Sequence, residues 1–205
     1  QLDMVVVSAG KFEQRVGEVT QSLSVLPSAI IRDKNTTDLS DALDQVPGVG
    51  VVDEDPQIRA GSGFSYGAGS RVMMLADGMP ILSGDIGRPN WTFLPIEDIQ
   101  QVEVIKGASS VLYGSAALSG VINVRSAWPG DVPKTRASVF AGAYDTPGNA
   151  DSKWWGPNPP LITGASFFHS ERFKKFDLVV AGNAFGDQGY VGPEPVPADT
   201  IAKDP

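Results

Sequence analysis

The chain has 205 residues and a formal net charge of −8, with 41% of its residues hydrophobic and 20% charged. Such an acidic chain lacks the basic face that general nucleic-acid binding requires, so the composition excludes that class of protein. There is no cysteine, which excludes disulfide bonds and thiolate chemistry. No apolar run reaches the length of about 18 residues that a membrane-spanning helix needs. The chain opens with Gln1 and Leu2, as a processed or truncated terminus would.

Short strands are predicted along the first part of the chain, up to about residue 128. Residues 5–8 and 22–26 are β-branched or alternate in polarity, which is typical of strands. Further short strands are expected at 58–59, 72–76 and 79–82. The dipeptide Asp77-Gly78 predicts a two-residue hairpin turn between the last two of them.

Two short helices are predicted in the same region. Pro27 opens the first, which runs to about Lys34. Thr37 is the expected N-cap of the second, whose apolar residues at 39, 42, 43 and 46 repeat at helical spacing. Pro47 and Gly48 end this helix.

The stretch from residue 96 to residue 124 has an unusual composition. A helical turn at 96–99 leads into a strand at 102–105, and a second strand follows at 121–124. The connector between these strands consists mostly of Gly, Ala and Ser, as a flexible linker does. Leu112 and Tyr113 interrupt it, which indicates that the connector packs against something.

The pattern of predicted elements changes after Pro129, from short strands and helices to longer strands. Residues 135–144, 161–171 and 176–185 form three strand-like runs of about ten residues. The connection at 172–175 is short and basic, whereas the connections at 145–160 and from 186 onward are long. This alternation is typical of an outer-membrane barrel, but the barrel signal is weak in each segment, and the pattern alone favours a soluble antiparallel sheet. The side-chain alternation along 161–185 does not separate a lipid-facing from a lumen-facing side.

Residues 1–128 resemble the plug domain of TonB-dependent outer-membrane receptors. The resemblance lies in four blocks in the family's order, namely LSDALDQVPGV (39–49), IRAG (58–61), RVMMLADGMPI (71–81) and IEDIQQVEVIKGASSVLYGSAALSGVINV (96–124). Ala60, Ala108 and Ser119 depart from the commonest family residues, and Lys106 stands where Arg is commoner. Residues 135–185 resemble the first three barrel strands with lower specificity.

The resemblance implies an α+β fold in which a small mixed β-sheet plug with short helices lies inside a barrel of about 22 strands. Residues 1–128 would form the plug, and residues 129–205 the start of an incomplete barrel of about three strands. In this arrangement the small residues of the connector fit between the plug sheet and the barrel wall, and Leu112 and Tyr113 anchor it. A barrel of that size needs roughly 220 residues before loops are counted, so we expect the chain to be a fragment of a receptor.

The function that the resemblance implies is uptake of a scarce nutrient across the outer membrane of a Gram-negative bacterium. The nutrient would be a ferric siderophore, cobalamin, haem or an oligosaccharide, and energy would come from TonB, ExbB and ExbD. The partners would thus be TonB, the chain's own barrel, the nutrient and the outer membrane. The sequence does not identify the nutrient. The alternative is a soluble, secreted β-rich ligand-binding module in which residues 135–185 close a β-sandwich.

The N-terminal segment resembles the TonB box of the family. An extended, β-prone segment without proline can add its backbone to an edge strand of TonB. The alternative is a structural first strand of the plug. The residues concerned are Asp3, Met4, Val5, Val6, Val7, Ser8 and Ala9.

Three loops map to the substrate-facing turns of the family, at 52–57, 61–70 and 83–93. Aromatic rings among glycines can stack on flat ligands or sugar rings. The alternative is a set of solvated loops, and for the acidic triplet at 53–55 a solvated run of charge is expected. Pro56 and the missing turn glycine argue against an EF-hand. The candidate residues are Asp53, Glu54, Asp55, Phe64, Tyr66, Asp85, Arg88, Asn90 and Trp91.

Arg59 and Lys106 occupy positions where basic plug residues of the family pair with carboxylates on the barrel wall. We expect these carboxylates beyond residue 205, so that within this chain the two cations are unpaired or paired locally. Lysine lacks the bidentate fork of arginine, which weakens such a lock.

No catalytic or metal-binding constellation is apparent in the sequence. His169 is the only histidine, and no G-x-S-x-G elbow occurs. The segment GASSVLYGSAA lacks the spacing and the Gly-Lys-Ser/Thr ending of a phosphate loop. We therefore expect no enzymatic activity, no cofactor and no metal site.

Overall fold

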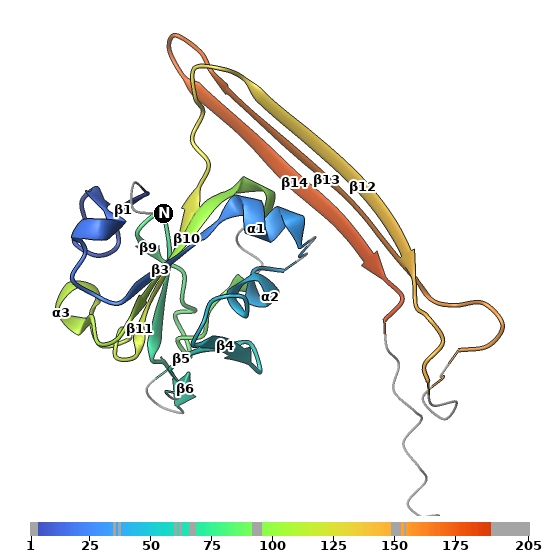
Figure 1. Cartoon of the computed structure of the whole chain (residues 1–205), viewed down its shortest axis with the longest axis horizontal. Coiled ribbons are helices and arrows are strands. Elements are labelled where there is room, and N and C mark those ends of the chain that lie inside the picture. Colours follow the sequence, from blue (N-terminus) through green and yellow to red (C-terminus); the bar gives the residue numbers. More distant parts are fainter. Residues whose placement is uncertain are drawn as a thin grey trace, which may run out of the picture.

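The structure, a computed structural model, describes residues 4–34, 36, 38–59, 61, 63–65, 69–91, 96–148, 153 and 155–189. Its centre is a five-stranded sheet in the order β3-β10-β11-β8-β9 (Figure 1). The strands are β3 (Leu23–Pro27), β8 (Val72–Ala76), β9 (Met79–Pro80), β10 (Ile99–Lys106) and β11 (Gly120–Ser126). β10 runs antiparallel to both β3 and β11, whereas β11 and β8 are parallel. The sheet is therefore mixed.

The two middle strands, β10 and β11, are buried on both faces. Val102, Val104 and Ile105 of β10 are at most 2% exposed, and Val121 and Ile122 of β11 are fully buried. Strands of this kind read as nearly continuous apolar runs, which is why the sequence motif predicts them well. Glu103 interrupts the run in β10 and is nevertheless fully buried.

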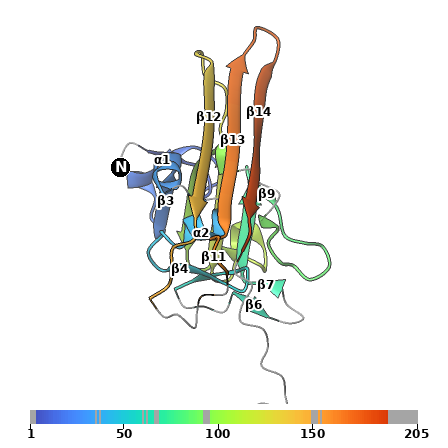
Figure 2. The same cartoon turned by 90° about the vertical axis from the view of Figure 1, so that its right-hand side faces the viewer.

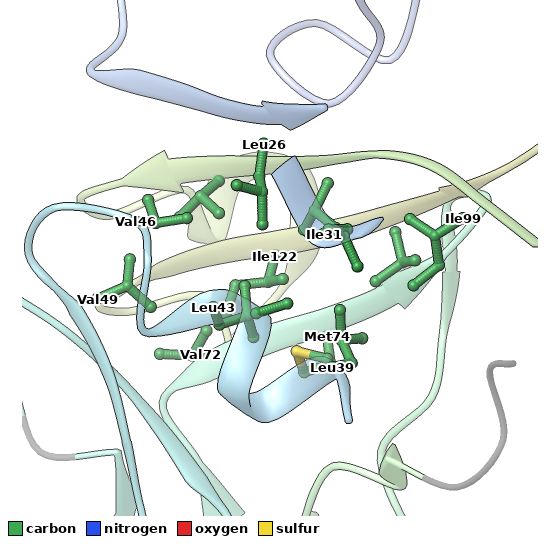
Figure 3. Packing of buried hydrophobic residues seen from close by; sticks show 14 of the residues in the cluster. Leu26, Ile31, Leu39, Leu43, Val46, Val49, Val72, Met74, Ile99 and Ile122 are labelled. Atoms are coloured by element: carbon green, nitrogen blue, oxygen red, sulfur yellow. The ribbon is translucent and has the colours of Figure 1, made fainter. Parts of the chain in front are cut away.

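Two short helices cover one face of the sheet. They are α1 (Ser28–Asp33) and α2 (Leu39–Leu43), and Leu39 and Leu43 of α2 point toward Met74 and Ile122 of the sheet (Figure 3). Pro27 precedes α1 as predicted. The predicted cap of α2 is wrong, because the side chain of Asp38 accepts the N–H of Ser40 at 2.7 Å and thus caps the helix. Thr37 itself lies outside the described residues.

Small hairpins and single turns surround the central sheet. The hairpins pair β1 (Val5–Val6) with β2 (Gln14–Arg15), β4 (Val49–Val52) with β5 (Asp55–Ile58), and β6 (Phe64–Ser65) with β7 (Gly69–Ser70). The turns are η1 (Val16–Glu18), η3 (Ile96–Asp98) and α3 (Ser110–Tyr113). The strand at 49–52 was not predicted.

The predicted turn at Asp77-Gly78 is confirmed. Asp77 and Gly78 both have positive φ, at 48° and 83°, as a type I′ hairpin requires. The side chain of Asp77 accepts the N–H of Ser126, and Asn123 accepts the N–H of Gly78. These bonds tie the hairpin to β11.

A second, three-stranded antiparallel sheet lies beside the five-stranded sheet and its helices (Figures 1 and 2). It consists of β12 (Lys134–Ala143), β13 (Leu161–Arg172) and β14 (Asp177–Asp187), at the positions predicted from the sequence. The described strands do not close into a barrel. No helix in the described part of the chain combines the length and the apolarity of a membrane-spanning helix.

The small-residue connector between β10 and β11 folds back on the second face of the sheet. Ala117 is fully buried there, and Tyr113 packs against the cluster that contains Met73 and Ile105. Gly120, where β11 begins, allows the closest approach: a Cβ at this position would lie 2.3 Å from the carbonyl oxygen of Ile105. Tyr113 thus anchors the connector, and glycine is required where it rejoins the sheet.

Substitution of this glycine tests the close approach directly. Gly120→Ala forces the backbone of β10 and β11 apart, and we expect the free energy of unfolding to fall by about 1–3 kcal/mol in urea denaturation. Gly130→Ala is the matched control, because a Cβ at Gly130 meets no atom within 4 Å. Equal stability of the two variants would contradict the packing of this connector.

Candidate functional site

The tip of the β4–β5 hairpin projects two carboxylates. Asp53 and Glu54 both have positive φ, at 51° and 68°, and form the two-residue turn that closes the pair Val52–Asp55. Their side chains are exposed. The next residue, Asp55, differs from them because its side chain points inward and is only 7% exposed. The predicted solvated run of charge is thus wrong for Asp55.

Asp55 is paired with an arginine that is 33 residues away in the sequence. Nη2 of Arg88 donates to Oδ2 of Asp55 at 3.0 Å, and the guanidinium carbon of Arg88 lies 4.6 Å from the ring centroid of Phe64. Burial raises the pKa of Asp55 above its ordinary value of 3.8, although the charge and the hydrogen bond of Arg88 partly offset this effect. Three loops of the chain therefore meet at one guanidinium group.

The segment at 83–91 is folded by local hydrogen bonds. The N–H of Arg88 donates to Oγ of Ser83 at 3.0 Å, and the N–H of Ser83 donates to the carbonyl of Arg88 at 2.7 Å. Asp85 accepts the N–H of Ile86, and this bond lowers the pKa of its exposed carboxyl group. The N–H of Ser70 reaches the carbonyl of Gly87 and joins the segment to β7.

Trp91 closes this loop cluster. Its indole Nε1 donates to the carbonyl of Glu54 at 2.7 Å, and its ring packs in part against the hydrophobic core. The N–H of Asn90 donates to the carbonyl of Ile81, which fixes the backbone of the same loop. Trp91 therefore holds the loops together, a role that differs from both the ligand contact and the solvated loop considered from the sequence.

The loop cluster contains most of the predicted substrate-facing residues. Asp55, Phe64, Arg88 and Trp91 lie together with the backbone of Glu54, whereas the side chains of Asp53, Glu54 and Asp85 are exposed beside them. Tyr66 lies outside the described residues. The hairpins β4–β5 and β6–β7 lie toward the end of the molecule at which β12 ends and β13 begins (Figures 1 and 2). In the described part of the chain, no group of three or more His, Cys, Asp or Glu side chains could hold a metal ion.

The N-terminal segment from Met4 to Ala9 is folded against the plug. Val5 and Val6 pair with β2, and the carbonyl of Met4 accepts the N–H of Val16. Val6 is fully buried, and Ser8 is 1% exposed. Asp3 lies outside the described residues.

A buried partner of this segment was missed by the sequence analysis. Glu103 of β10 accepts the backbone N–H groups of Val7 and Ser8. The sequence did contain a sign of this buried carboxylate, because Glu103 lies between Val102 and Val104 in a strand that is too apolar to be solvent-exposed. The identity of its partner could not be read from the sequence, because Ser8 lies 95 residues away.

The two predicted lock residues, Arg59 and Lys106, bind local oxygen atoms. Nη2 of Arg59 donates to Oγ of Ser22 at 2.6 Å, and Nζ of Lys106 donates to the carbonyl of Pro47. Burial and, second, the charge of Arg59 lower the pKa of Lys106. Within the described residues neither cation forms an ion pair with a carboxylate.

A mixed sheet with short helices, lying beside a separate antiparallel sheet, defines a plug joined to the first strands of a barrel. Residues 15–121 match the family described as TonB-dependent Receptor Plug Domain. The chain belongs to this family, and the resemblance and the fold class predicted from the sequence motifs are confirmed.

Curated relatives and solved structures agree with this assignment. The vitamin B12 transporter BtuB of Vibrio vulnificus strain CMCP6 is 40% identical over 60% of this chain and 20% of its own length. The BtuB of strain YJ016 is 36% identical over 91% of this chain and 31% of its own. The siderophore receptor PirA of Pseudomonas aeruginosa is similar in fold, with a TM-score of 0.59 at 22% identity over 83% of this chain and 29% of its own.

The chain spans about a third or less of the length of these relatives. The relatives are named as transporters and receptors rather than as enzymes.

The ion pair at the loop cluster can be tested by its dependence on pH. A folded-state pKa above 3.8 means that Asp55 favours folding most when protonated, and that this contribution is lost as the pH rises through the raised pKa. Arg88→Ala leaves the buried carboxylate without its cation. We expect a loss of about 1–2 kcal/mol in urea denaturation at pH 7, reduced because Arg88 is partly exposed.

The loss should shrink as the pH falls toward 3.8, since a protonated Asp55 needs no cation. Arg15→Ala removes an exposed arginine of β2 and is the matched control. A loss that does not change with pH would show that Arg88 acts only through its contact with Phe64.

Proposed function

We propose that the chain is the plug and the first barrel strands of an outer-membrane receptor that imports cobalamin with energy supplied through TonB. Residues 1–128 form the plug in this proposal, and residues 129–205 begin the barrel wall. The protein resides in the outer membrane of a Gram-negative bacterium. The observation that carries the proposal is the division of the second sheet into an apolar face and a face turned toward the plug.

The face that points toward the plug carries polar and aromatic side chains. A cavity of about 520 Å³ separates this face from α1 and η3. Ile31 and Ile96 line it from the plug side, and Arg136, Ser138 and Phe168 line it from the strands. Arg136 also stacks on Phe168 at 4.2 Å and donates to the carbonyl of Glu97.

The opposite face of the same strands carries no charged side chain over its middle part. Val139 is 83% exposed, Phe167 45% and Val180 46%. The register places nine small or apolar residues on this face, namely Ala137, Val139, Ala141, Thr163, Ala165, Phe167, Val180, Gly182 and Ala184. An outward apolar band of this kind suits lipid, and it argues against the soluble secreted module.

The relatives support cobalamin as the nutrient. Those at 40% and 36% identity are named vitamin B12 transporters. The siderophore receptors among the solved structures are only 18–23% identical, so they support the fold and not the ligand. The loop cluster around Arg88 would then face the arriving cobalamin, beside the exposed carboxylates of Asp53 and Asp85.

The proposal includes the partners expected from the sequence. The segment from Asp3 to Ala9 would pair with TonB by strand addition, and its β-prone backbone supports this role. Arg59 and Lys106 would pair with carboxylates of the barrel wall. The lowered pKa of Lys106, which burial and Arg59 cause, supports a site that a carboxylate would stabilise.

A charged residue on the apolar face tests the contact with lipid. Val139 lies in the middle of β12, and Val139→Arg should destabilise the full-length protein in lipid by about 2–4 kcal/mol. Ala143→Arg, at the end of the same strand, should cost no more than about 1 kcal/mol. The measurement is reversible unfolding from vesicles, together with the amount of protein in outer-membrane fractions. Equal tolerance of both substitutions would contradict a lipid-facing β12.

The proposed nutrient is tested by equilibrium binding to the full-length protein. We expect cyanocobalamin to bind at least about tenfold more tightly than a ferric catecholate siderophore, a difference of about 1.4 kcal/mol. Isothermal titration with each ligand, and competition between them, measures this ratio. A folded protein that binds the siderophore and not cyanocobalamin would refute the assignment of the nutrient.

A further inference from the structure

Glu103 is a fully buried carboxylate at the centre of the plug. It belongs to β10, and Val102 and Val104 on either side of it point to the opposite face. A carboxylate removed from water is strongly unfavourable unless hydrogen bonds or cations compensate it. The groups that compensate the charge of Glu103 therefore hold the segments to which they belong close to β10.

Most of these groups come from the N-terminal segment. The backbone N–H of Ser8 donates to Oε2 of Glu103 at 2.8 Å, and the N–H of Val7 lies 3.1 and 3.2 Å from the two carboxylate oxygens. The hydroxyl of Ser8 donates to the same Oε2. Hydrogen bonds from neutral donors to a buried carboxylate are among the strong ones in proteins.

Two further side chains hold the carbonyl groups of the segment. Nε2 of Gln101 donates to the carbonyl of Val5 at 2.9 Å and to Oε1 of Glu103 at 2.8 Å. The hydroxyl of Tyr113 donates to the carbonyl of Ser8 at 2.6 Å. Tyr113 lies in the connector between β10 and β11, so the connector also fixes the N-terminal segment.

We propose that Glu103 is a latch that holds residues 5–8 on the plug and thereby sets how much of this segment is free for strand addition. This inference rests on the proposed pairing of the segment with TonB. The N–H groups of Val7 and Ser8 that Glu103 binds are groups that a partner strand would need. Docking on Glu103 and pairing with a partner strand are therefore alternatives.

The latch can open without leaving Glu103 uncompensated. Nη1 of Arg125 lies 3.7 Å from Oε1 of Glu103, and Gln101 remains beside it. Arg125, Gln101 and entering water can therefore compensate the charge of Glu103 after the N-terminal segment has left. The docked and the released segment are thus two states of one equilibrium, and the bonds to Glu103 bias it toward the docked state.

The test measures the mobility of the segment in the full-length protein. The 205 residues contain no cysteine, and Val5 is 43% exposed, so Val5→Cys accepts a spin label. Glu103→Gln keeps the size of the side chain but replaces one acceptor oxygen by a donor that repels the N–H groups. We expect its ratio of released to docked segment to rise about tenfold in electron paramagnetic resonance spectra. Affinity for the periplasmic domain of TonB should rise in parallel.

Two milder variants keep the test informative if Glu103→Gln does not fold. Ser8→Ala and Tyr113→Phe each remove one hydroxyl donor, and each should release the segment to a smaller extent. Glu18→Gln, which changes an exposed carboxylate outside the latch, is the matched control. Protein without an introduced cysteine controls for background labelling.

Increased mobility with tighter TonB binding would support the latch. Unchanged mobility in folded Glu103→Gln, Ser8→Ala and Tyr113→Phe proteins would overturn it. Increased mobility with unchanged TonB affinity would overturn the link to strand addition. That result would also place the failure in the proposed TonB pairing of residues 3–9, and not in the docking of the segment on Glu103.

Discussion

The antiparallel pairing of β10 with β11 is the interaction on which the other parts of the plug depend. These two strands form the middle of the central sheet, with apolar clusters on both of their faces. On one face, α1 and α2 pack against Val102 and Ile122, and on the other face the connector packs against Ile105 and Val121. Nearly complete burial of both faces makes this pair the main source of hydrophobic stabilisation in the plug.

The candidate sites are placed by this pair of strands. β10 carries Glu103, which binds the N-terminal segment, and ends at Lys106, which donates to the carbonyl of Pro47 between α2 and β4. β11 pairs with β8, which precedes the loop that holds Arg88.

Local sequence patterns correctly predicted elements whose formation depends on residues that are close in the sequence. The strand at 72–76, the Asp77-Gly78 turn and the start of α1 after Pro27 follow from propensity and turn chemistry, and the structure contains all three. The resemblance placed a turn at 52–57, but local patterns did not predict the hairpin tip at Asp53-Glu54, because two acidic residues rather than glycine adopt positive φ there. In the capping of α2, Asp38 took the role expected of Thr37, since both residue types suit an N-cap.

Interactions between distant residues were beyond the reach of local patterns. Burial of Asp55 depends on Arg88, and burial of Glu103 depends on Ser8, at separations of 33 and 95 residues. The alternation of apolar and polar residues along β13 did not show which face of the strand meets lipid. The register to β12 and β14 separates the two faces. The family resemblance predicted the architecture, but it did not identify these pairs.

The most direct test of the proposed function is uptake of radiolabelled cyanocobalamin by cells in which the full-length protein is the sole candidate cobalamin receptor. We expect cyanocobalamin to accumulate in cells with functional TonB and only to bind at the surface of cells without it. Accumulation that is independent of TonB, or the absence of uptake by protein that is correctly inserted in the outer membrane, would contradict it.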